Sequence, residues 1–128
     1  FTGELMFQNK FSLSIQFTCN TSSKSWILTN IYGPCNHEDK IEFIEWFGNI
    51  QMPNDVDWII MGDFNFIRKP EDRNKPGGDV NEMLIFNEAI SELGLIDLPL
   101  KGRQFSWSNM YDSPLLEKLD WFSPLLLG

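Results

Sequence analysis

Alternation of apolar and polar residues predicts strands near the beginning of the chain. From residue 11 to residue 18 every second residue is apolar, and this period of two is typical of a strand with one buried face. The polar stretch CNTSSK at 19–24 indicates a turn, and SWILTNIY at 25–32 then predicts a second strand. The first part of the chain is therefore expected to supply strands to a sheet.

An uninterrupted apolar run predicts a central strand that leads into a candidate site. Ile59, Ile60 and Met61 follow one another without a polar residue, which is typical of a strand covered on both faces. The run ends in GDFN at 62–65. Loops at the ends of such strands are where α/β proteins commonly place their chemistry. The pattern therefore draws attention to Asp63 and Asn65.

Two helices are predicted, one before and one after this strand. Asn36 is a suitable N-cap for the first, and the second is expected to run from about Asn81 to a stop at Gly94. Four apolar residues at helical spacing are expected to bury the first helix against the sheet: Ile41, Ile44, Phe47 and Ile50. LIDL, QFSWS and EKLDWF predict short strands near the end. This order predicts an α/β fold, a mixed sheet with flanking helices.

Composition bounds the class of protein. The chain has 128 residues, 42% of them hydrophobic, which suits one domain across 1–128. It contains no apolar stretch long enough to span a bilayer, so we expect no membrane partner. Its two cysteines, Cys19 and Cys35, lack zinc-binding spacing and are expected to be free thiols without a disulfide-linked partner. An intracellular location is the corresponding expectation.

Charge bears on a nucleic-acid partner. A net charge of −8 argues against non-specific attraction to phosphates, although a cation site must itself be acidic and a bound metal reverses the local charge. A basic segment follows GDFN and contains Arg68, Lys69, Arg73 and Lys75. Such a segment is either a solvated loop or a surface that steers phosphate.

Four polar side chains suggest a site for magnesium and phosphate. Two residues apart on a strand, Asp63 and Asn65 would face the same side, and Tyr32 and Asp120 also lie in predicted strands. Magnesium prefers oxygen ligands, and a carboxamide can contact a phosphoryl oxygen or orient the attacking water. Taken singly, each has a plainer interpretation: Asp63 and Asn65 as turn residues, Tyr32 as a packed strand residue, Asp120 as a paired surface carboxylate.

Their order along the chain resembles a known family. NIYGP at 30–34, WIIMGDFN at 58–65, KGRQFSWSN at 101–109 and KLDWF at 118–122 resemble the endonuclease/exonuclease/phosphatase superfamily. The resemblance is closest to the endonuclease domains of plant non-LTR, LINE-type retrotransposons. It implies a DNase I-like two-sheet α/β sandwich that hydrolyses phosphate esters with magnesium, with DNA as the partner and the nucleus as the location.

The resemblance also assigns roles by position. It implies Tyr32, Asp63 and Asn65 as catalytic residues: Asp63 activates or orients water, and Asn65 contacts the scissile phosphate. Ser106 and Trp107 match a Thr-Trp segment that binds phosphate or substrate, with serine in place of threonine. Asp63 together with Asp120 would hold the metal.

Three pieces of the family pattern have no counterpart in these 128 residues. They are an asparagine on a first strand, a metal-binding glutamate on the next strand and a final Ser-Asp-His segment. His37 is expected to be a solvated first-turn residue. We therefore expect a partial domain that is weakly active or inactive by itself. The alternative is a non-catalytic remnant or interaction domain that keeps the core of the fold, and a phosphatase is a third reading.

Overall fold

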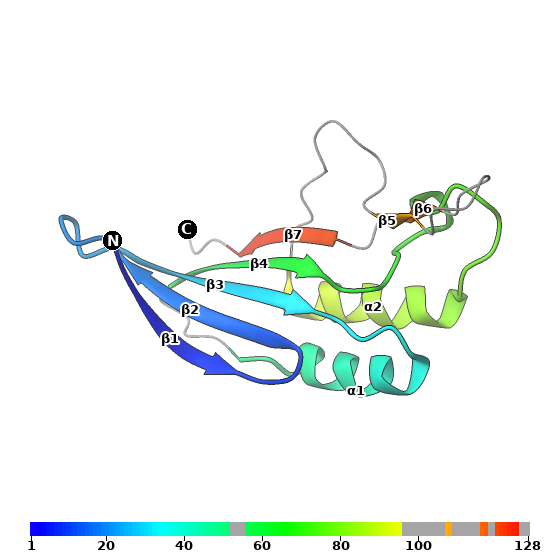
Figure 1. The fold of residues 1–128 in the computed structure, drawn as a ribbon, viewed down its shortest axis with the longest axis horizontal. Helices are drawn as coiled ribbons and strands as arrows, with labels where there is room; N and C mark the ends of the chain where they lie inside the picture. The colour runs from blue at the N-terminus through cyan, green and yellow to red at the C-terminus, as the bar shows by residue number, and fades with distance from the viewer. Residues whose placement is uncertain (52–55, 96–106, 109–115, 118–119, 126–128) are drawn as a thin grey trace.

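A mixed five-stranded sheet forms the centre of the structure, a computed structural model that describes residues 1–51, 56–95, 107–108, 116–117 and 120–125. The strand order is β1–β2–β3–β4–β7 (Figure 1). The bounds of these strands are β1 Thr2–Gln8, β2 Ser12–Thr18, β3 Ser25–Tyr32, β4 Asp57–Asp63 and β7 Asp120–Leu125. A separate pair of short strands joins β5 Trp107–Ser108 to β6 Leu116–Glu117.

Neighbouring strands of the sheet pair in both parallel and antiparallel directions. β1, β2 and β3 pair antiparallel, whereas β4 runs parallel to β3 after a crossover through helix α1, His37–Gly48. β7 is antiparallel to β4 on its other side. The predicted α/β class with a mixed sheet and helices is thus confirmed.

Both helices cover the same side of the sheet (Figure 1). Helix α2, Val80–Leu93, ends at Gly94, whose φ of 69° is the left-handed conformation that a glycine stop permits. The core between helices and sheet is rich in phenylalanine rings, and the Phe66 and Phe86 rings stack with centroids 4.9 Å apart. The largest fully buried hydrophobic side chains in this core are Ile27, Ile31, Phe43, Phe47, Ile60, Phe66 and Phe86.

Three polar side chains are buried on the helix-facing side of β2 and β3. Ser14 and Thr29 share a hydrogen bond between their hydroxyl oxygens, 2.7 Å apart, and the indole Nε1 of Trp58 donates to the Thr29 hydroxyl at 2.9 Å. Ser12 bonds to the Asn9 side chain at 3.1 Å. Each buried hydroxyl therefore has a partner, which removes most of the cost of burying it.

The prediction that β4 is covered on both faces is wrong for the described part of the chain. Trp58 and Ile60 point toward the helices and are buried, but Met61, on the opposite face, is 39% exposed. Ile59 on that face is half-buried. The helices shield only one face, and an apolar run cannot tell a strand buried on both faces from one buried on a single face.

Helix α1 also turns a different face toward the core from the one predicted. Phe47 is fully buried as expected, and Ile44 and Ile50 pack at the margin of the core, but Ile41 is 46% exposed. Phe43 is buried in its place. Residues 41 and 43 lie two apart, about 200° around a helix, so only one of them can face the sheet.

Strand β1 had no counterpart among the predicted elements. Six of its seven residues are exposed, because it is an edge strand that pairs with β2 alone, and they show no clean alternation. Of the predicted late strands, QFSWS overlaps β5 and EKLDWF overlaps β6 and β7, while most of LIDL lies outside the described residues. In the part of the chain that the structure describes, no helix is long and apolar enough to cross a membrane.

The turn between β2 and β3 makes Cys19 unusually acidic. Hydrogen bonds from the Ser22 and then the Thr21 hydroxyl stabilise the thiolate and lower its pKa from 9.0 to about 6; the Thr21 oxygen lies 3.3 Å from Sγ. Because the thiolate is the reactive form, alkylation of Cys19 by iodoacetamide should level off above about pH 7.

Mass spectrometry of a Cys35→Ser protein across pH 5 to 10 measures this profile. Ser22→Ala in the same background should move the midpoint upward. A Cys19 profile still rising steeply between pH 8 and pH 10 would contradict the assignment.

Candidate functional site

The predicted site residues lie where neighbouring strands end or begin. Tyr32 is the last residue of β3 and Asp63 the last of β4, and the two are direct neighbours in the parallel register. Asp120, the first residue of β7, pairs with Asp63 from the other side. The sheet therefore brings the backbones of these three residues into one row, and Tyr32 and Asp63 share the face that points away from the helices.

Hydrogen bonds fasten the loop after β3 to the loop after β4. The Gly33 N–H donates to the Asp63 carbonyl oxygen at 2.6 Å, and the Asn65 side-chain Nδ2 donates to the Gly33 carbonyl oxygen at 2.5 Å. A Cβ at Gly33 would lie 2.2 Å from the Phe64 carbonyl oxygen. This close approach explains the glycine of the NIYGP segment, since any side chain would separate the two loops.

Asp63 and Asn65 meet for a different reason from the one predicted. β4 ends at Asp63, so the two residues do not share a strand, and Asn65 has a φ of 57° in the left-handed region that asparagine tolerates. That turn lets the Asn65 backbone N–H donate to the Asp63 carboxylate Oδ1 at 2.9 Å. The carboxylate and the amide are therefore oriented by a tight turn, a common use of Asp and Asn.

Tyr32 is directed away from Asp63. Its side chain is 40% exposed, and its hydroxyl donates to the Asn9 carbonyl oxygen at 3.2 Å. Asn9 lies in the turn between β1 and β2, on the opposite side of β3 from β4. A contact between this hydroxyl and a phosphate at Asp63 requires the side chain to leave Asn9.

The other predicted residues are placed less completely. Asp120 pairs with Asp63 through the backbone register, and Trp107 begins β5 in the small second sheet, opposite Glu117. Ser106 lies outside the described residues. Their assigned roles, like those of Tyr32, Asp63 and Asn65, stay predictions.

In the basic segment after GDFN, Arg68 is held to helix α2, whereas Lys69 and Lys75 are exposed to solvent. The Arg68 Nε donates to the Asn87 side chain on α2 at 2.7 Å, and Asn87 donates back to the Arg68 carbonyl oxygen at 2.8 Å. The buried Asp72, in the short 3₁₀ helix Pro70–Asp72, accepts the backbone N–H of Arg68 at 3.0 Å. Arg68 therefore anchors the segment to α2.

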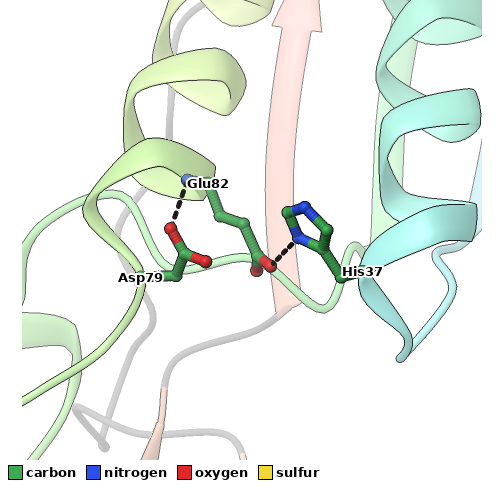
Figure 2. A group of neighbouring side chains, drawn as sticks. All are labelled: His37, Asp79 and Glu82. Carbon is green, nitrogen blue, oxygen red and sulfur yellow. Dashed lines mark hydrogen bonds and ion pairs between the residues drawn. The ribbon is translucent and has the colours of Figure 1, made fainter.

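A second group of ionisable side chains lies between the helix starts. His37, the first residue of α1, is exposed as expected, but its Nδ1 lies 3.0 Å from the Glu82 carboxylate on α2. Asp79 completes the group (Figure 2). Nothing in the sequence pattern indicates this group, because 45 residues separate His37 from Glu82.

Comparison with solved structures shows that the chain has a DNase I-like fold. The endonuclease domain of TRAS1, a telomere-specific non-LTR retrotransposon, superposes with a TM-score of 0.68 at 11% identity, covering 94% of this chain and 55% of its own. A β-hairpin deletion mutant of beta toxin from Staphylococcus aureus gives a TM-score of 0.62 at 18% identity, covering 91% of this chain and 44% of its own.

These likenesses define the fold, and the chain spans about half the length of either structure. No family model matches the sequence, and no curated protein does.

Proposed function

We propose that this chain carries the central part of a magnesium-dependent phosphodiesterase site, similar to the DNA endonucleases of non-LTR retrotransposons, including those of plants. The observation that carries the proposal is the meeting of Tyr32, Asp63 and Asp120 in one row across the sheet, with Asn65 fastened to Asp63. DNA as the substrate and the nucleus as the location are parts of the same proposal. The fold shared with the TRAS1 endonuclease domain supports it.

The donor atoms at this end of the sheet suit magnesium. Asp63 supplies a carboxylate, an oxygen ligand of the kind that Mg²⁺ prefers, and the backbone register brings Asp120, the second proposed metal ligand, opposite Asp63. The Asn65 N–H orients the Asp63 carboxylate through Oδ1, as outer hydrogen bonds commonly orient metal ligands. Bound magnesium would neutralise charge on the phosphate, while Asn65 would position that phosphate.

A non-catalytic remnant that keeps the core of the fold is the second candidate. The observation that favours it is the Tyr32 hydroxyl, which is bonded to Asn9 rather than directed at Asp63. A phosphatase on the same scaffold has no observation of its own in its favour.

Manganese, a paramagnetic substitute for magnesium, tests the site by NMR. We expect Mn²⁺ to broaden the amide signals of Gly33, Asp63 and Asn65 first, and Asp63→Asn to abolish that broadening. The asparagine keeps an oxygen that can accept the Asn65 N–H, so the turn should survive while the charge is lost. Asp57→Asn, at the opposite end of β4, is the matched control and should leave the broadening intact.

Nicking of supercoiled plasmid with magnesium then tests whether these residues form a working site. We expect these 128 residues to nick near background, in line with the missing groups. Nicking that disappears in Asp63→Asn would show a working site and reject the remnant. Broadening at Gly33, Asp63 and Asn65 that persists in Asp63→Asn would count against the proposed metal ligand.

A further inference from the structure

The first turns of α1 and α2 bring three potential metal ligands together. The Nδ1 of His37 and carboxylate oxygens of Asp79 and Glu82 all lie within 4.8 Å of one another. Figure 2 shows the three side chains converging from two helix starts, with the His37 ring directed at Glu82. Asp79 and Glu82 belong to one element, and His37 to the other.

Local structure fixes this arrangement. Asn36 caps α1 by accepting the Asp39 N–H at 2.8 Å, which makes His37 the first helical residue. Asp79 caps α2 by accepting the Glu82 N–H at 3.1 Å through one carboxylate oxygen, Oδ1. Each cap therefore determines where the helix begins and which way its first side chains point.

Glu82 is held by a contact from outside the group. The Lys40 ammonium, which is largely buried, lies 2.7 Å from Oε1, while Oε2 faces His37 at 3.0 Å. The two Glu82 oxygens thus have separate partners: Oε1 contacts Lys40, and Oε2 points toward the His37 imidazole. A hydrogen bond of this kind behind a carboxylate is the usual way in which a metal ligand is oriented.

We propose that His37, Asp79 and Glu82 bind a transition-metal ion of the Zn²⁺ type and so link the starts of the two helices. One imidazole nitrogen with two carboxylate oxygens is a donor set for zinc, and it leaves a position for water. Zinc bonds to these atoms are about 2.0–2.2 Å long, so the exposed His37 and Asp79 side chains must rotate inward to share one ion. The imidazole distinguishes this site from the all-oxygen group at Asp63.

Lys40 is expected to weaken zinc binding at this group. Its positive charge beside Glu82, together with the positive ends of two helices, opposes a cation at this position. Replacing Lys40 with Gln should therefore tighten zinc binding, since the amide still donates to Glu82 without the charge. The rival reading is an ion-pair network of His37, Glu82 and Lys40 that binds no metal.

Zinc titration by calorimetry tests the proposal, in a Cys19→Ser, Cys35→Ser background that removes both thiols. Asp79→Asn keeps the helix cap, and Glu82→Gln keeps an oxygen acceptor for Lys40, so both variants should fold. We expect each of them, and His37→Ala, to weaken zinc binding at least tenfold, and Asp57→Asn, outside both proposed sites, to leave it unchanged. Magnesium should not compete.

Either of two results would overturn the site. Undetectable zinc binding by the parent protein would leave only the ion-pair network. Equal affinity in the parent, Asp79→Asn and His37→Ala would place the zinc elsewhere. The magnesium proposal depends on Asp63, which lies outside this group, so neither result bears on it.

Discussion

Replacing Phe47 with alanine is expected to lower the free energy of unfolding by about 3 to 5 kcal/mol. The ring is fully buried and packs on Phe43 and Phe64, with centroids 5.6 and 5.5 Å away. Its removal leaves a cavity between α1 and the sheet that these large rings cannot easily fill. Urea unfolding of the two proteins, followed by fluorescence, measures the difference.

Ile41→Ala on the same helix is the matched control. Ile41 shares the predicted apolar stripe with Phe47 but is 46% exposed, so its truncation should change stability by no more than about 0.5 kcal/mol. Equal losses in the two variants would mean that α1 presents a different face to the sheet. Phe47 also contacts Phe64, the residue between Asp63 and Asn65. Removing the Phe47 ring should therefore also loosen the packing that holds the candidate site.

Several elements could be located from the sequence, but not always the face that they bury: in β2 the polar Ser12 and Ser14 are buried, whereas the alternating Leu13 and Ile15 are only half-buried. The strand predicted at 25–32 coincides with β3, and the helix expected to stop at Gly94 does so. β1 escaped prediction because an edge strand exposes most of its residues. Whether Ile41 or Phe43 is buried depends on which face of α1 packs on the sheet. The local sequence pattern does not contain that information.

The candidate site likewise has features that the sequence predicts and features that only the structure shows. The sequence places Asp63 and Asn65 at the end of an apolar strand, whereas the left-handed Asn65 and its bond to Gly33 depend on two loops that are 32 residues apart. The grouping of His37 with Glu82 depends on helix packing over 45 residues. Contacts between segments far apart in the chain carry no periodic signal, so only the fold reveals them.

The structure accounts for each residue of the GDFN segment. Phe64 is buried in the core and anchors the loop, so the residues on either side of it remain at the surface of the site. Asp63 and Asn65 bond to each other across that anchor. Gly62 lies against β3, where a Cβ would be 2.1 Å from the Ile31 carbonyl oxygen. The segment therefore combines a close strand approach, a polar turn and an apolar anchor.

Gly62→Ala is accordingly expected to be severely destabilising. Gly62 has a φ of 135°, a conformation that side chains rarely adopt, and its new methyl group would collide with backbone rather than with a flexible side chain. Backbone strain of about 1 to 3 kcal/mol and overpacking of a similar size add to roughly 2 to 6 kcal/mol. Separation of β3 from β4 would relieve the collision, and it would also part Tyr32 from Asp63.

Gly48→Ala provides the contrast, because Gly48 ends helix α1 and a Cβ there would meet nothing within 4 Å. We expect this variant to be neutral or more stable by up to about 1 kcal/mol, since alanine favours helix over glycine. Thermal unfolding of both variants beside the parent protein measures the contrast. A Gly62→Ala protein as stable as Gly48→Ala would mean that β3 and β4 do not approach as closely as the site requires.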